Sequence, residues 1–494
     1  MYLIGYDVGT SSIKATLMDS QTGQSVASAG SPQKEMAIIA SQPGWAEQKP
    51  LKWWENVRVA TAKILSQARI DLADIKAIGI TYQMHGLVCV DKDLEPIRPS
   101  IIWCDSRAVK IGEKATKELG PRHCLENLLN YPGNFTASKL KWVMENEPEN
   151  FEKIYKIMLP GDYIAMKMTG RITTTASGLS EAILWDFKQQ QIARFLLDRF
   201  GIPKEMLPDI VPTFGVQGQL TKTAAEELGL KKGIKIAYRA GDQPNNAFSL
   251  NVLNPGEIAA TAGTSGVVYG IGEKPNYDPN SRVNTFVHVN DTPQSHRYGV
   301  LLCVNGTGIL NSWLKTNAMN SKDYTQMNEL ASKAPIGSEG LVILPFGNGA
   351  ERTLGNRDIC ASIHGLNFNT HDISHCLRGA QEGIVFALNY GLRIMQDMGI
   401  TVKTVRAGDA NMFLSPLFGS AFAAITGAVL ELYNTDGSQG AARGAGVGAG
   451  VFKNFDDAFI GLTKTRTIEP DKSQIQAYQD AYQQWLNILR SQLD

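Results

Sequence analysis

Two aspartates that follow short apolar segments are the residues of this sequence best suited to chemistry. Asp7 directly precedes the segment 8–12, Val-Gly-Thr-Ser-Ser, and Asp242 lies within Ala-Gly-Asp-Gln at 240–243. A carboxylate at a strand end lies where ligands bind in α/β sheets. Asp7 could hold Mg²⁺ through water, and Asp242 could accept a proton from an attacking hydroxyl. The pattern indicates phosphoryl transfer; the alternatives are a hairpin turn at Asp7 and a turn before a capped helix at Asp242.

Two similar turns could bind the phosphates of ATP. The first consists of Gly9, Thr10, Ser11 and Ser12, and a second Gly-Thr-Ser-Gly string spans 263–266. Glycine lets the backbone turn tightly and approach an anion, while amides and hydroxyls donate to phosphate oxygens. Because both strings lie between apolar segments, we predict strand–turn–strand hairpins and an internal duplication. Two such turns facing one cleft would hold a polyphosphate from both sides.

A second set of polar residues could bind the hydroxyls of an acceptor. His85 follows a predicted strand, and Asp105 follows a short apolar segment. Together they could bind vicinal hydroxyls, with the Trp103 ring as an apolar wall. A satisfied core histidine is the structural alternative for His85.

The elements that would position these residues alternate between strands and helices. The hydrophobic pattern predicts a hairpin, then a helix opened by Lys49-Pro50, then a strand, which is typical of a mixed α/β sheet. A boundary is expected near 245–256. We predict strands at 2–8, 13–19, 75–82, 234–238 and 402–407, and helices at 374–398 and 474–492.

Bulk composition narrows the class of partner. The 494 residues carry 48 basic and 48 acidic side chains, which argues against nucleic acid or an anionic membrane as the main partner. The six cysteines form no Cys-x-x-Cys pair, so a reducing compartment is expected. Without a secretory signal or a long apolar run, we predict a cytoplasmic protein. A homodimer remains open.

Two motifs resemble known functional sites but are better explained otherwise, and a third motif is absent. The segment 371–375, His-Asp-Ile-Ser-His, resembles a zinc helix but has Asp in place of Glu, and Asp372 is better explained as a helix-start residue. The glycine-rich segment 444–450 is better explained by close packing than by dinucleotide binding. No Gly-Lys dipeptide occurs, so a Walker A loop is absent.

Taken together, the motifs resemble those of the FGGY family of carbohydrate kinases nearly end to end. The segments that carry the resemblance are 7–12, 83–86, 103–107, 159–163, 241–243, 263–266 and 349–353. The resemblance implies an α/β protein with two ribonuclease H-like domains of the actin-like ATPase superfamily and a cleft between them. An N-terminal sugar-binding domain would span 1–248, and a C-terminal ATP-binding domain with a closing helix would span 249–494.

The resemblance also implies roles for individual residues. Asp242 would be the general base, and Asp7 would organise Mg²⁺ and phosphate, so that both aspartates lie at the metal. Gly263, Thr264 and Ser265 would contact ATP. The sugar would be bound by Met84, His85, Asp105, Gln243 and Trp103. The string at 83–86 points to D-xylulose within the family.

One segment departs from the family pattern, and the substrate leaves alternatives. Where relatives often carry a Gly-Gly-Gly-Ala-Lys-Ser-type adenine loop, this chain has Gly408, Asp409 and Asn411. We expect nucleotide contacts from Gly408 and Asn411, with Asp409 unexplained. The alternatives are a kinase of the same fold for gluconate, ribulose, fuculose or glycerol, or a non-kinase actin-like ATPase.

Overall fold

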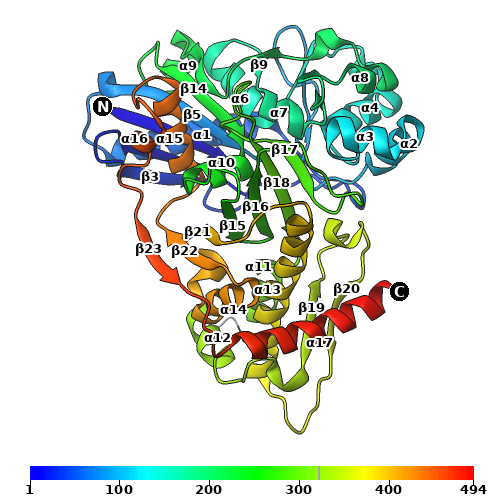
Figure 1. Cartoon of the computed structure of the whole chain (residues 1–494). Helices are drawn as coiled ribbons and strands as arrows, with labels where there is room; N and C mark the ends of the chain where they lie inside the picture. The colour runs from blue at the N-terminus through cyan, green and yellow to red at the C-terminus, as the bar shows by residue number, and fades with distance from the viewer. Residues whose placement is uncertain (321–322) are drawn as a thin grey trace. The chain divides into compact units, whose positions relative to one another are not determined.

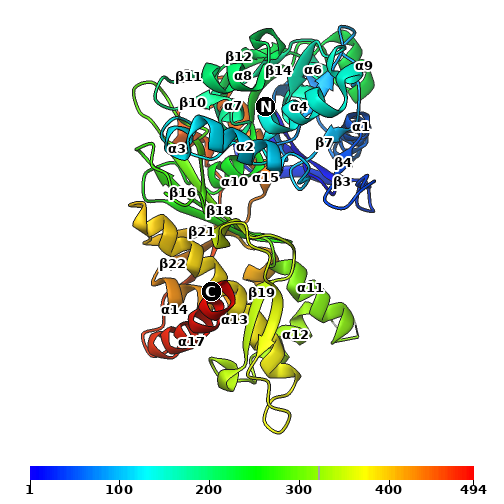
Figure 2. The same cartoon turned by 90° about the vertical axis from the view of Figure 1, so that its right-hand side faces the viewer.

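The computed structural model describes residues 1–320 and 323–494, which form two compact units (Figures 1 and 2). The first unit combines Met1–Asn251 with Phe286–Tyr298 and Thr435–Leu462. The second combines Val252–Thr285, Gly299–Asn434 and Thr463–Asp494. The chain therefore passes between the units more than once, and the domain limits 1–248 and 249–494 stay a prediction.

The first unit is built on a six-stranded sheet with the order β13-β14-β5-β1-β2-β3. β1 pairs antiparallel with β2 and parallel with β5, and β14 pairs parallel with β5. The predicted strands are confirmed, and β14 runs on to Gly241, directly before Asp242. The strands are β1 (Tyr2–Val8), β2 (Ile13–Asp19), β3 (Ser25–Ser31), β5 (Ile75–Tyr82), β13 (Phe214–Gln219) and β14 (Lys235–Gly241).

Helices cover both faces of this sheet. On one face, the Tyr6 hydroxyl bonds to Thr61 of α1 (Pro50–Gln67) at 2.6 Å. On the other, α15 (Gly437–Gly448) packs on β1 and β5, as Figure 1 shows with the orange helix beside the blue strands. Because both faces are covered, β1 and β5 are nearly continuous apolar segments rather than alternating ones. The other helices used below are α4 (Thr136–Asn146), α6 (Pro160–Thr169), α7 (Ala176–Glu181) and α10 (Asp242–Ser249).

Close packing of α15 on β14 depends on glycines of α15. A Cβ on Gly444 would lie 2.5 Å from the Tyr238 ring, and one on Gly448 would lie 1.8 Å from the Ala237 carbonyl oxygen. The prediction that the small residues of 444–450 serve packing is thus confirmed. The segment lies at the C-terminal end of α15, and the strand before that helix is β22 (Val429–Tyr433).

The second unit repeats the arrangement of the first. The second sheet runs in the order β17-β18-β16-β15-β21-β22-β23, with β15–β16 antiparallel and β15–β21–β22 parallel. The strands from β18 to β23 repeat the order of the first sheet, and β17 (Asn284–Val287) is an additional edge strand. The predicted hairpin at 258–268 is confirmed, and the repeated order supports the predicted duplication. The strands are β15 (Ile258–Ala262), β16 (Gly266–Gly272), β18 (Tyr298–Val304), β21 (Thr404–Gly408), β22 and β23 (Lys464–Ile468).

Long helices enclose the apolar core of the second unit. The predicted helices at 374–398 and 474–492 are confirmed, and Figure 2 shows them packed together below the sheet. Among the described residues, no helix is both long and apolar enough to cross a membrane. The elements are α11 (Gly308–Asn317), α12 (Tyr324–Ala331), α13 (Ile373–Asp397), α14 (Pro416–Thr426), α17 (Ile475–Leu493) and the hairpin β19–β20 (Val342–Phe346, Cys360–His364).

Candidate active site

The carboxyl ends of three parallel strands bring Asp7 and Asp242 together in the first unit. Asp7 lies beside Thr81 of β5, and Thr81 lies beside Ala240 of β14. Asp242 then begins α10. Carboxyl ends of adjacent parallel strands share one sheet edge. Both aspartates therefore lie at the same edge, as the sequence predicts.

The two carboxyl groups repel one another. Burial raises the pKa of Asp242 to about 7, and the nearby Asp7 charge adds to this rise. Burial also raises the pKa of Asp7 to about 6, which Lys14 partly offsets and Asp436 increases. The Gln243 side chain donates to Asp242. Such an acidic pair fits a divalent cation, because a cation would stabilise both ionised carboxylates.

Gly437, at the start of α15, also lies at this edge, and sequence reasoning missed it. A Cβ on Gly437 would lie 2.8 Å from Asp7 Oδ2, so only glycine allows the start of α15 to approach so closely. The carbonyl of Gly437 accepts from Asn245 Nδ2 at 2.9 Å, and Asp436 caps α15 by accepting from the Gln439 amide. The helix cap was readable from Asp-Gly-Ser-Gln, but its meeting with Asp7 was not.

The Gly9–Ser12 turn is tied to neighbouring segments of the same unit. The Thr10 hydroxyl donates to Gln83 Oε1 at 3.1 Å and accepts from Trp103 Nε1 at 3.0 Å. Gln48 Nε2 donates to the Thr10 carbonyl at 2.8 Å. The single hydroxyl hydrogen of Thr10 is therefore used within the protein, so phosphate donation by Thr10 would fall to its backbone amide.

The predicted sugar-binding residues lie near this edge but differ in their surroundings. Met84 is buried beside Gly241, where a Cβ on the glycine would lie 2.7 Å from Met84 Cγ. Lys139 Nζ donates to the carbonyls of His85 at 2.8 Å and Ile102 at 3.0 Å, which joins the two predicted sugar-binding segments.

Asp105 is fully buried and strongly engaged. Its carboxylate accepts from the Arg107 guanidinium at 2.6 Å and from the Ala46 amide at 2.6 Å. The Arg107 guanidinium in turn lies over the Trp45 ring, 3.8 Å from its centroid. Direct sugar binding by Asp105 stays a prediction, and the contacts present give it a structural role in holding this loop.

In the second unit, the predicted phosphate turn meets the start of α11. The amides of Gly308 and Ile309 donate to the carbonyls of Gly263 and Thr264 at 2.9 and 3.1 Å. A Cβ on Gly263 would lie 3.7 Å from Asn411 Nδ2. Gly263, Thr264 and Asn411 are thus brought together, and sequence reasoning missed the contribution of Gly308.

Asp409 has a structural explanation. It accepts from Thr465 Oγ1 at 2.8 Å and pairs with Arg466 at 2.5 Å, both on β23. The Arg466 contact lowers the pKa of Asp409. The residue therefore joins the end of β21 to β23, across the intervening strand β22.

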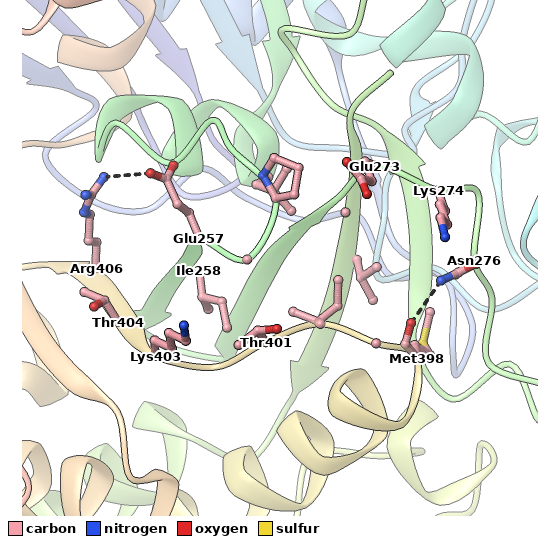
Figure 3. Close-up of a pocket in the computed structure, with 17 residues that line it drawn as sticks. Glu257, Ile258, Glu273, Lys274, Asn276, Met398, Thr401, Lys403, Thr404 and Arg406 are labelled. Carbon is pink, nitrogen blue, oxygen red and sulfur yellow. Dashed lines mark hydrogen bonds and ion pairs between the residues drawn. The ribbon is translucent and has the colours of Figure 1, made fainter. Parts of the chain in front are cut away.

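A separate hollow of about 660 Å³ in the second unit contains none of the predicted site residues (Figure 3). It lies where β15 begins, at the end of that strand away from Gly263. Figure 3 shows Arg406 paired with Glu257, and Asn276 Nδ2 donating to the Met398 carbonyl at 3.0 Å. The predicted phosphate-binding residues of this unit, Gly263, Thr264 and Ser265, follow the opposite end of β15.

Comparison with known protein families shows which family this chain belongs to. Residues 2–249 match the N-terminal domain, and residues 258–451 the C-terminal domain, of the FGGY family of carbohydrate kinases. The chain belongs to this family. It is therefore an enzyme that transfers a phosphoryl group from ATP to a sugar, and the alternative of a non-kinase ATPase is wrong.

Individual relatives of this FGGY kinase agree over nearly the whole chain. Xylulose kinase of Bacillus subtilis (strain 168) is 28% identical over 99% of this chain and 96% of that relative. A solved structure from Brucella ovis, described as a xyloylose kinase, has a TM-score of 0.88 and 25% identity, covering 99% of both chains. Gluconate kinase from Lactobacillus acidophilus has a TM-score of 0.90 at 23% identity, covering 100% of this chain and 98% of that one, which shows the shared fold.

The raised pKa values of the FGGY kinase predict an unusual pH dependence of stability. Because Asp242 has a higher pKa when folded than its ordinary 3.8, the folded state binds more protons, and its contribution to stability falls as pH rises from about 4 to about 7. Each unit of pKa shift corresponds to about 1.4 kcal/mol. Urea unfolding at several pH values should therefore show Asp242→Asn gaining stability relative to wild type as pH rises. A constant difference across this range would contradict the shift.

Proposed function

We propose that this FGGY kinase phosphorylates D-xylulose, giving D-xylulose 5-phosphate and ADP. The observation that carries the proposal is the meeting of Met84, Gly241 and Asp242 at one sheet edge, in a chain whose full-length relatives include xylulose kinases. At such an edge, the carboxyl group proposed to accept the proton would lie beside Met84, which is expected to bind the sugar.

Asp242 would act as the general base. It would accept the proton of the attacking hydroxyl, and Gln243 would hold its carboxylate in place. A phosphoryl transition state is loose, so positioning matters more than base strength. Met84, His85 and Trp103 would bind the sugar, with Asp105 supporting their loop through Arg107.

The phosphates of ATP would be bound by two sets of groups. The turn of Gly9, Thr10, Ser11 and Ser12 would donate in the first unit, and Gly263, Thr264, Ser265, Gly408 and Asn411 would do so in the second. Asp7 and Asp242 would hold Mg²⁺, which neutralises phosphate charge when bound. The raised pKa values of the two buried carboxyl groups support this assignment, since a bound cation would stabilise their ionised forms. A cytoplasmic location, supported by the cysteine pattern, and a homodimer are part of the proposal.

A panel of acceptors tests the substrate. With purified enzyme and Mg·ATP, coupled ADP release should give the highest kcat/KM for D-xylulose among D-xylulose, gluconate, ribulose, fuculose and glycerol. We expect at least about a tenfold preference, because a buried polar site discriminates strongly against acceptors that leave its groups unpaired. A higher kcat/KM for any other member would reject D-xylulose while leaving the sugar kinase assignment intact.

A further inference from the structure

We propose that Glu181, the last residue of α7, is a positioning residue that holds His85 so that its Nε2 accepts a hydrogen bond from a sugar hydroxyl. The inference rests on the proposed function, because it assumes that His85 contacts the sugar. It adds a residue and a direction of hydrogen bonding that neither the sequence motifs nor the family resemblance assigns.

Glu181 contacts His85 at two points, although the two residues are 96 positions apart in sequence. Its side-chain Oε2 accepts from the His85 amide at 3.1 Å, and its backbone carbonyl lies 2.8 Å from His85 Nδ1. The remaining oxygen, Oε1, accepts from the Tyr82 hydroxyl at 2.7 Å. With only 1% of Glu181 exposed, both carboxyl oxygens are committed to these buried partners.

The backbone of His85 needs such support. Its φ of 62° lies in the left-handed region, which residues other than glycine adopt only when the surroundings hold them there. The His85 amide is held by Glu181, and its carbonyl is held by Lys139 Nζ at 2.8 Å. Loss of the Glu181 carboxyl would leave the His85 amide without this acceptor and would free the backbone to relax.

The same residue determines which ring nitrogen of His85 carries the proton. A backbone carbonyl can only accept, so Nδ1 must be the N–H that donates to it. In the neutral ring, Nε2 then carries the lone pair. The Phe135 ring lies edge-on to His85 at 4.8 Å between centroids, which limits rotation of the imidazole. The group that His85 binds must therefore be a donor, which fits a sugar hydroxyl and excludes the ketone oxygen.

Glu181 also borders the general base. A Cβ on Gly241 would lie 3.2 and 3.3 Å from its two carboxyl oxygens, and Gly241 directly precedes Asp242. The buried Glu181 carboxyl group thus contacts His85 on one side. On the other side it lies beside Gly241, the residue before Asp242. Burial raises the pKa of Glu181 well above its ordinary value, and a neutral carboxyl still accepts from the His85 amide. Glutamine should therefore replace it well.

Kinetics of paired variants test the inference. Glu181→Met keeps the length of the side chain but removes both acceptors, and should raise KM for D-xylulose at least about tenfold while KM for ATP stays within about twofold. Glu181→Gln should keep KM for the sugar within about threefold. Tyr82→Phe, which leaves both contacts with His85, is the matched control and should behave like wild type. Equal effects of Glu181→Met and Tyr82→Phe, or no effect of Glu181→Met, would overturn the inference.

A second measurement does not depend on the sugar. Nitrogen-15 NMR of the imidazoles, with His85→Ala identifying the His85 signals, should show a protonated Nδ1 and an unprotonated Nε2 in the wild-type enzyme without substrate. A protonated Nε2 would overturn the inference even if Glu181→Met fails to fold. If wild type phosphorylates another sugar of the panel, the proposed substrate fails, and the same variants are compared on that sugar.

Discussion

Asp242→Asn should lower kcat by about 10²- to 10⁴-fold while leaving the sugar dissociation constant within about threefold. The amide keeps the shape of the side chain but cannot accept the proton of the attacking hydroxyl. Because the chemical step is lost and the binding residues Met84 and His85 are untouched, the effect should fall on kcat rather than on binding. Coupled ADP release gives kcat, and calorimetric titration of the sugar gives the dissociation constant.

The free energy of unfolding distinguishes the expected loss of turnover in Asp242→Asn from misfolding. Removing one of two repelling carboxyl groups should leave the free energy of unfolding at pH 8 at least as high as that of wild type, because the raised pKa values of Asp7 and Asp242 show that their ionised forms are disfavoured. Asp186→Asn is the matched control: Asp186 is buried in the same unit, and its Oδ1 accepts from the amides of Lys188 and Gln189, which asparagine can still satisfy. A kcat for Asp242→Asn near that of this control would show that Asp242 is not the base.

Gly5→Ala should destabilise the first unit by about 3 kcal/mol or more, which is the upper part of the range for overpacking. A Cβ at Gly5 would lie 1.9 Å from the Ser438 carbonyl oxygen and 2.4 Å from the Ala442 amide nitrogen. Both atoms belong to the backbone of α15, so no side-chain rotation can relieve the overlap. Either α15 moves away from β1, which also displaces Gly437 from Asp7, or the sheet distorts.

Gly30→Ala on β3 is the matched control for this substitution. Its Cβ would meet nothing closer than the Ile13 carbonyl oxygen at 3.8 Å, and the free energy of unfolding should change by less than about 1 kcal/mol. Urea unfolding followed by circular dichroism measures both variants, and ADP release follows the expected loss of turnover in Gly5→Ala. Equal stability of the two variants would mean that α15 does not pack on β1 as closely as the structure places it.

Residues close together in the sequence were sufficient to predict many of the strands and helices. The hairpin strands around Gly9 and Gly263, the helix after Pro50 and the long helix at 373–397 follow from turn residues and apolar spacing, which act between near neighbours. The same local reasoning gave the strand ends that precede Asp7 and Asp242. The motif resemblance then gave the kinase family, which the family match confirms.

Contacts between distant segments could not be read in this way. The closure of Gly437 on Asp7 joins residues 430 positions apart, and the bonds from Glu181 to His85 join residues 96 apart. Neither pair has a local pattern, because glycine in a helix and glutamate at a helix end are both common. For Asp105, the sequence suggested a sugar ligand, which stays a prediction, while only the structure shows its contacts with Arg107 and Ala46.

By itself, the sequence determined the strands and helices that it predicted, the two repeated turns and the acidic residues able to take part in phosphoryl transfer, because these depend on residue type and short-range spacing. Only the tertiary structure decided which nitrogen of His85 meets the Glu181 carbonyl, which residue accepts the single hydroxyl hydrogen of Thr10, and why the pKa of Asp242 is raised to about 7. Those properties depend on burial and on partners supplied by distant segments, which exist only once the sheet edge and α15 have come together.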